Sequence, residues 1–157
     1  MTLFVPRVRS YHEGMDALAF LRDRVSLFAG VSDENLAALA SVSEVLSFKA
    51  GQTILFKGAT VDGLHIVVTG QADVHMRASN KTMVRVAELS EGEVFGEMSI
   101  VEMGIAGATI KASGNGAVVL MLPQESFRRV LQQDEAFAVR VNVLIVSRRS
   151  APVSIPA

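Results

Sequence analysis

The stretch Gly63-Leu-His-Ile-Val-Val-Thr-Gly70 is an apolar, β-branched run with a glycine at each end. β-branched residues favour strands, and glycines allow the tight turns that join short strands. The same texture continues on both sides, so we expect further strands at residues 54–56, 72–76, 83–87 and 118–122. Many short strands separated by glycine turns predict a β-sandwich or small barrel over about residues 45–122.

Helical spacing flanks this β region on both sides. Residues 16–25 carry apolar side chains three and four positions apart, and Ser32, followed by two acids, predicts the start of a helix over 35–42. Pro123 suits the first turn of another helix, and residues 135–149 form a further predicted helix. That last segment has little polar face, so we expect the barrel and a second partner to cover it.

The composition excludes several classes of function. The chain has 157 residues, of which half are hydrophobic and 20% are charged, and this composition predicts one folded domain. Its net charge of −1 gives no electrostatic support for direct nucleic-acid binding. It has no cysteine, which removes disulfides, thiol catalysis and zinc–thiolate sites. The three histidines show no ligand spacing, so we expect no metal site.

The domain organisation follows from these patterns. We divide the chain into an N-terminal arm and helix (1–25), a folded domain (26–149) with its C-terminal helices at about 123–149, and a flexible tail (150–157). The longest apolar runs are far shorter than the ~20 residues of a membrane helix. We therefore expect a cytoplasmic protein without membrane contact. No nucleophile–base pair is visible, so we expect no enzymatic activity.

The stretch Leu89-Ser-Glu-Gly-Glu-Val-Phe-Gly-Glu-Met-Ser-Ile100 carries the candidate chemistry. Gly96 permits a tight turn, and residues 97–102 can form a short helix whose free N–H groups attract an anion. Glu97 beside it offers two acceptor oxygens that suit a hydroxyl. Backbone N–H groups that donate to a phosphate, next to a carboxylate that accepts from a sugar hydroxyl, would fit a nucleotide. The simpler interpretation is a glutamate that stabilises a helix start beside a core phenylalanine and a turn.

The chain from about residue 26 to residue 149 resembles the cyclic nucleotide-binding domain family. The glycines follow the family's order and spacing in the segments 27–31, 48–58, 63–70 and 92–97. The resemblance implies a mainly β fold, namely an eight-stranded jelly-roll (double-stranded β-helix) barrel. Helices would precede the barrel, a short phosphate-cassette helix would interrupt it, and two C-terminal helices would follow.

The resemblance also implies a ligand site in the cassette. Glu97 would accept a hydrogen bond from the ribose 2′-hydroxyl, and the backbone amides near it would face the sugar and the phosphate. The family arginine that pairs with the cyclic phosphate falls on Ala106. Loss of a charge-assisted hydrogen bond of roughly 1.5–3 kcal/mol predicts weak binding of cAMP, cGMP or a related nucleotide. The predicted ligand-binding residues are Phe95, Gly96, Glu97, Met98, Ser99, Ala106, Gly107, Ala108 and Thr109.

Two hypotheses follow from this pattern. In the first, the chain is a sensor domain, and the resemblance implies that ligand draws the last helix over the base as a lid. Asn142 and Leu144 are the candidate lid residues, and Arg85 is a candidate replacement for the missing arginine. In the second, a degenerate domain binds no nucleotide and uses its apolar last helix as a homodimer or protein-partner surface.

Overall fold

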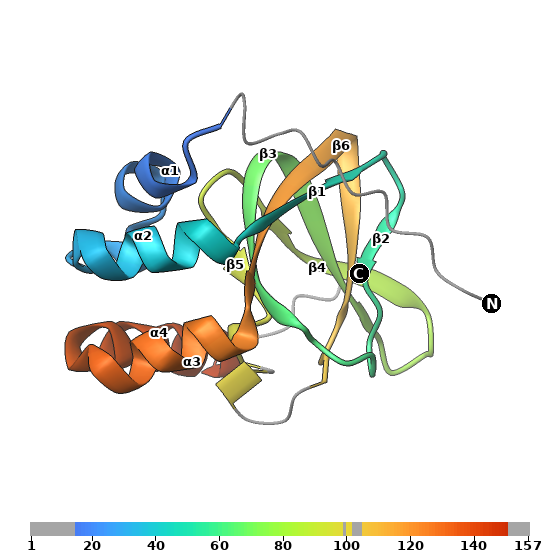
Figure 1. The fold of residues 1–157 in the computed structure, drawn as a ribbon. Helices are drawn as coiled ribbons and strands as arrows, with labels where there is room; N and C mark the ends of the chain where they lie inside the picture. Colours follow the sequence, from blue (N-terminus) through green and yellow to red (C-terminus); the bar gives the residue numbers. More distant parts are fainter. Residues whose placement is uncertain (1–14, 99, 102–104, 151–157) are drawn as a thin grey trace.

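A β core with flanking helices, as expected, is seen in the computed structural model, which describes residues 15–98, 100–101 and 105–150. The predicted arm at 1–14 and most of the tail lie outside these residues. The helices gather on one side of the strands (Figure 1). They are α1 (Ala17–Arg24), the 3-10 helix η2 (Ser26–Phe28), α2 (Asp33–Val42), α3 (Gln124–Gln133) and α4 (Glu135–Ser150). The strands are β1 (Glu44–Phe48), β2 (Thr53–Leu55), β3 (Gly63–Arg77), β4 (Met83–Leu89), β5 (Val94–Phe95) and β6 (Thr109–Pro123).

Strands β3 and β6 form the centre of the sheet, and each is 15 residues long. They pair with each other, and the sheet order is β1-β6-β3-β4, with β2 added to β6 and β5 added to β3. The C-terminal half of β6 pairs with β1 and its N-terminal half pairs with β2. The first half of β3 pairs with β5 and its second half pairs with β4. Strands β3 and β6 therefore run through both halves of the sheet (Figure 1). One half has the order β5-β3-β6-β1, and the other has the order β4-β3-β6-β2.

The expected count of eight strands is not confirmed, because hydrogen bonding defines six strands in the described part of the chain. The predicted strands 64–68 and 72–76 are one strand, β3, whose register against β6 shifts just before Thr69 and just after Gly70 without breaking. Gly70 has a φ of +80°, and a Cβ there would lie 2.1 Å from the Gly116 carbonyl oxygen. Glycine is therefore required where the strand bends.

Side-chain caps mark the starts of three helices. Ser32 Oγ accepts a hydrogen bond from the Asn35 N–H at 3.1 Å, so α2 starts at Asp33, two residues earlier than expected. Asp16 Oδ1 caps α1 in the same way. Asp134 Oδ1 accepts from the Phe137 N–H at 3.0 Å at the start of α4. Each side chain satisfies an N–H that has no partner inside its helix.

Two clusters of buried residues explain why the central strands are apolar on both faces. The strand cluster draws on all six strands and comprises Leu46, Phe48, Ile54, Val67, Ala72, Leu89, Phe95, Ile110, Ala112, Ala117 and Val119. The helix cluster combines the helices with the other face of the strands and includes Leu21, Phe28, Leu39, Leu64, Ile66, Ile100, Ala106, Leu120, Phe127, Val130, Phe137 and Ile145. Neighbours on β3 alternate between the two clusters, so residues 64–67 are all buried.

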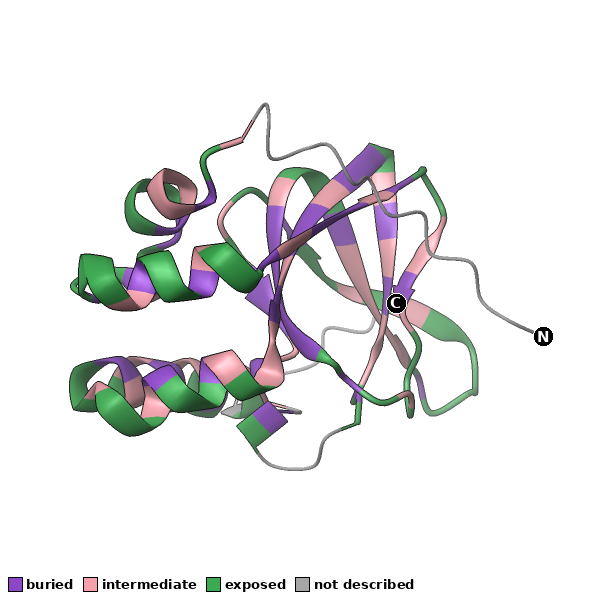
Figure 2. Cartoon of the chain, viewed as in Figure 1, coloured by how far each residue is buried: buried purple, intermediate pink, exposed green. Residues whose placement is uncertain are grey.

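Helix α4 is covered on one face only. Phe137, Val141 and Ile145 are buried, spaced four residues apart toward the helix cluster. The opposite face exposes Val139, Val143 and Val146, which are 57%, 62% and 52% exposed. Figure 2 shows exposed residues along the outer surface of the helices. The expected second cover is therefore not supplied by the described residues. None of the described helices combines the length and apolarity that a bilayer crossing requires.

Candidate functional site

Strand β5 leads into the turn that positions the candidate site. Gly96 has a φ of +92°, and a Cβ there would approach the Gly63 carbonyl oxygen to 3.2 Å. Only glycine fits this turn without strain. The chain then enters a short helical segment, in which residues 97–98 and 100–101 are described and the Ile100 N–H donates to the Gly96 carbonyl at 3.1 Å. The predicted cassette helix is thus present at these residues.

His65 packs against the residues that flank the Gly96 turn. Its ring stacks on Phe95, with centroids 5.0 Å apart, and Nδ1 lies 3.0 Å from the Gly63 carbonyl oxygen. A carbonyl oxygen can only accept, so Nδ1 carries a proton and donates it. Burial lowers the pKa of His65 to about 4. The neutral ring therefore fixes Phe95 and Gly63, the two neighbours of the Gly96 turn.

Glu97 is the central polar residue of the site. Its side chain is 2% exposed, and its Oε1 accepts a hydrogen bond from Arg148 Nη1 at 2.6 Å. Its Oε2 is buried and has no hydrogen-bond partner among the described residues. A buried carboxylate is unfavourable unless it is paired, and Arg148 on α4 supplies the paired cation. The unpartnered Oε2 leaves capacity for one more donor.

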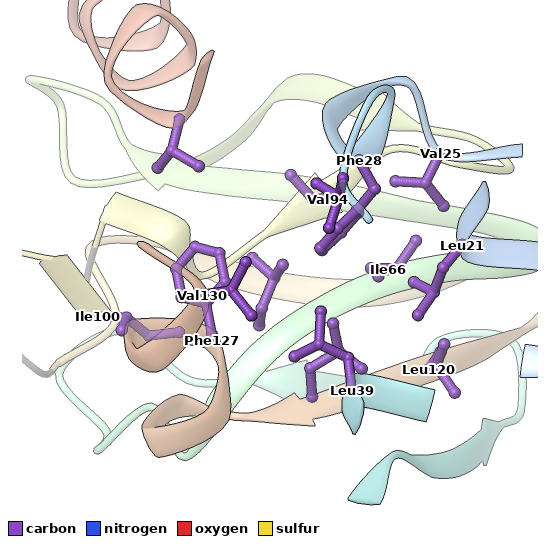
Figure 3. Packing of buried hydrophobic residues seen from close by; sticks show 14 of the residues in the cluster. Leu21, Val25, Phe28, Leu39, Ile66, Val94, Ile100, Leu120, Phe127 and Val130 are labelled. Atoms are coloured by element: carbon purple, nitrogen blue, oxygen red, sulfur yellow. The ribbon is translucent and has the colours of Figure 1, made fainter. Parts of the chain in front are cut away.

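The cassette segment is also attached to α3. Arg128 Nη2 donates to the Ile100 carbonyl at 2.6 Å. The Ile100 side chain is fully buried in the helix cluster, where it lies next to Phe127 and Val130 (Figure 3). Both C-terminal helices therefore contact the cassette directly, α3 through Arg128 and α4 through Arg148.

The other predicted ligand-binding residues lie in different surroundings, and their contact with a ligand stays a prediction. Ala106 is 4% exposed and belongs to the helix cluster, and its N–H donates to the Ala59 carbonyl at 2.8 Å. Thr109 Oγ1 accepts from the Lys57 N–H at 3.2 Å and so holds two chain segments together. Gly107 is exposed and Ala108 is half-buried. Met98 is half-buried against the helix cluster, and Ser99 lies outside the described residues.

The predicted lid residues lie on α4, and the predicted replacement cation lies on β4. Asn142 is exposed on α4, whereas Leu144 is half-buried and packs against the helix cluster. Arg85 lies on β4, where it pairs with Glu88 at 3.0 Å and approaches Asp73 to 3.8 Å. Arg85 is 56% exposed, so these contacts do not exclude another partner, and its role as the missing ligand cation stays a prediction.

Arg148 is the site residue that the sequence did not indicate. It is 51 positions from Glu97, and no local motif connects the two. One signal was available, because Arg148 follows Ile145 by three residues and therefore continues the buried face of α4. Among the described residues, no group of three or more histidine, aspartate or glutamate side chains could hold a metal ion.

Comparisons with known proteins agree with this topology. A model of the cyclic nucleotide-binding domain matches residues 45–134. The cGMP-dependent protein kinase egl-4 of Caenorhabditis elegans is 28% identical over 109 residues, which cover 69% of this chain and 14% of the kinase. The chain thus spans a small part of the length of this relative.

Two solved structures share the fold at 20% identity. The regulatory domain of Toxoplasma gondii PKA with cAMP has a TM-score of 0.72, over 86% of this chain and 49% of that one. The regulatory subunit of a cAMP-independent protein kinase A from Trypanosoma brucei has a TM-score of 0.71, over 91% and 47%. At this identity the likeness shows the fold alone. With its model matched over more than half of the residues, the chain belongs to the cyclic nucleotide-binding domain family.

Proposed function

We propose that this chain is a regulatory sensor domain that binds a cyclic nucleotide, cAMP or cGMP, through Glu97. One observation carries the proposal: Glu97 is a buried carboxylate whose Oε2 has no partner among the described residues. A buried acceptor without a donor is unfavourable by about 1–3 kcal/mol. A ligand hydroxyl that donates to Oε2 would remove this cost, and a ribose offers such a hydroxyl.

Binding should be weak. Ala106 stands where the family has its phosphate-binding arginine, and its methyl group belongs to the apolar helix cluster. No cation can come from this position. The missing charge-assisted hydrogen bond corresponds to about ten- to a hundredfold in affinity. Glu97 and the backbone of the Gly96 turn would then carry recognition.

The signal would pass to the C-terminal helices. Arg128 and Arg148 attach the cassette to α3 and α4, and Ile100 packs into the cluster that the two helices share. A ligand that shifts the cassette therefore changes the contacts of both helices. Output through protein contact would follow from the new position of these helices.

Calorimetric titration with cAMP and with cGMP tests the proposal. We expect weak binding of at least one nucleotide, and Glu97→Ala should weaken it at least about tenfold because the acceptor is lost. Glu93→Ala is the matched control, since Glu93 lies on the other side of β5 and is exposed. Absence of binding to both nucleotides, or equal affinity in Glu97→Ala and the wild type, would refute the proposal.

A second candidate function is a protein-interaction module that binds no nucleotide. The exposed stripe Val139, Val143 and Val146 on α4 supports it, because contiguous apolar surface is typical of interfaces. A homodimer or a protein partner would cover this stripe. Sedimentation of the wild type and of Val143→Glu tests the homodimer. A dimer that the substitution dissociates supports it, whereas a wild-type monomer argues against it.

A further inference from the structure

Arg148 covers the buried carboxylate of Glu97. The glutamate side chain is 2% exposed, while the arginine side chain paired with it is 28% exposed. Oε2 is also buried, so neither carboxylate oxygen is open to solvent. Arg148 is paired with Glu97 and is itself partly exposed, so it lies on the solvent side of the carboxylate. A ligand hydroxyl therefore reaches Glu97 only after this cover moves.

We propose that Arg148 belongs to the ligand site and holds it closed, so that a ligand hydroxyl reaches Oε2 of Glu97 only after Arg148 has moved away from Oε1. This inference rests on the proposed function, because it concerns the same carboxylate. Ligand binding would break the ion pair and release the end of α4. The direction is opposite to that of a lid, since Arg148 already attaches α4 to the cassette in this structure.

The rest of α4 has other attachments, which confine the movement to its last turns. Phe137 stacks on Phe28 with centroids 5.0 Å apart and meets Phe127 edge-on at 5.8 Å. Arg140 Nε donates to the Leu27 carbonyl at 3.1 Å. These contacts lie in the first half of the helix, whereas Arg148 lies near its end. Ile145 is also buried in the helix cluster, so loss of the Arg148 bond frees only the last turn of α4 while the preceding turns stay packed.

The competition sets the direction of the affinity change. Any ligand must first break the charge-assisted hydrogen bond between Arg148 and Glu97, which reduces its apparent affinity. Removal of the arginine abolishes this penalty. It also leaves Glu97 buried without a cation, and a ligand donor relieves that state as well. Both effects predict tighter binding when Arg148 is replaced by an apolar residue.

Titration of the full chain with cAMP and cGMP provides the first test. Arg148→Met keeps much of the aliphatic stem and removes every donor, and we expect it to bind about tenfold or more tightly than the wild type. Arg129→Met is the matched control, since Arg129 is an exposed arginine on α3 and its loss changes the net charge equally. The control should bind like the wild type. Weaker or equal binding by Arg148→Met would overturn the inference.

The second test follows the end of α4 directly. The chain has no cysteine, so Val146→Cys provides a single attachment point for a nitroxide label at a side chain that is 52% exposed. We expect saturating nucleotide to sharpen the electron paramagnetic resonance lines as the helix end becomes mobile. Glu97→Gln in the same background should sharpen them without ligand, and this variant serves if Arg148→Met does not fold.

The outcomes separate the two proposals. Nucleotide that binds the labelled wild type while the label stays immobile overturns the Arg148 inference and leaves the proposed function intact. No binding to the wild type together with tight binding to Arg148→Met supports the Arg148 inference and refutes the proposed function, which requires that the wild type binds a nucleotide. No binding to either protein removes the proposed function, and the Arg148 inference with it.

Discussion

Two arginine–glutamate pairs attach helices to the chain on either side of β5, and they differ in burial far more than in geometry. Arg24 Nη1 on α1 lies 2.8 Å from Glu91 Oε1, and Arg148 Nη1 on α4 lies 2.6 Å from Glu97 Oε1. The side chains of the first pair are 65% and 46% exposed, and those of the second are 28% and 2% exposed. Distance alone therefore does not distinguish a surface contact from a structural one.

Burial decides what each pair can do. When the exposed pair opens, water solvates both charges, so little free energy separates its open and closed states. When the buried pair opens, Glu97 loses its only hydrogen-bond partner among the described residues and needs a replacement. Only the buried pair can therefore couple a ligand to the position of a helix.

The largest expected effect tests whether apolar packing or Arg148 holds α4 in place. Phe137→Ala removes a fully buried ring from its contacts with Phe28 and Phe127. We expect a loss of about 3–5 kcal/mol in the free energy of unfolding, measured by chemical denaturation. Val143→Ala on the exposed face should change it by less than about 0.5 kcal/mol. A Phe137→Ala loss below about 1 kcal/mol would make Arg148 the main attachment.

The next effect concerns His65, which supports β5 between the two pairs. Its folded pKa of about 4 is below the ordinary value of 6.5, so the unfolded chain binds the proton more readily. Its contribution to stability is therefore complete above pH 6.5 and is lost as the pH falls toward 4, by roughly 3 kcal/mol in all. His65→Phe keeps the stacking on Phe95 and removes this titration.

The measurement is the unfolding free energy of wild type and His65→Phe between pH 4 and pH 7. Other groups titrate in both proteins, so the difference between the two curves isolates His65. We expect the wild type to lose stability relative to the variant as the medium becomes acidic. A difference that stays constant over this range would mean that water reaches the His65 ring.

Local patterns predicted most of the fold. The glycine-bounded apolar runs predicted β2, β3, β4 and the C-terminal half of β6, while helical spacing, Ser32 and Pro123 predicted the helices. Strand β5 was not predicted because it has two residues. The first half of β6 was not predicted either, because Gly114 and Gly116 interrupt it and its pairing with distant strands compensates for its weak intrinsic preference.

In the candidate site, too, local sequence predicted one residue and missed a contact between residues far apart in the chain. Glu97 was found because it follows Phe95 and Gly96 directly in the chain. Arg148 was not found because its partner lies 51 positions away, and only the packing of α4 brings the two together. The sequence did not predict the burial of Ala106 either. Because Ala106 is buried, Ala106→Arg places a charge in an apolar cluster instead of simply restoring a phosphate contact.

A smaller effect is expected when the buried pair is broken. Arg148→Met leaves the Glu97 carboxylate without its cation and should lower the unfolding free energy by about 1–3 kcal/mol, below the value for a fully buried pair because Arg148 is partly exposed. Adding Glu97→Gln should recover part of the loss, since the remaining buried group is then neutral. A double-mutant cycle in denaturant measures this coupling. Additive losses would mean that the two side chains do not interact in solution.

The smallest effect is expected at the exposed pair and completes the comparison. Arg24→Met removes the partner of Glu91, and we expect a loss below about 1 kcal/mol, because both charges are already hydrated in the folded chain. The coupling in a cycle with Glu91→Gln should fall further in 1 M salt, where the Debye length is about 3 Å. The Arg148–Glu97 coupling should persist in the same salt, because ions cannot approach a carboxylate that is 2% exposed. Equal salt sensitivity of the two couplings would show that Glu97 is open to solvent, and then a ligand could reach it without displacing Arg148.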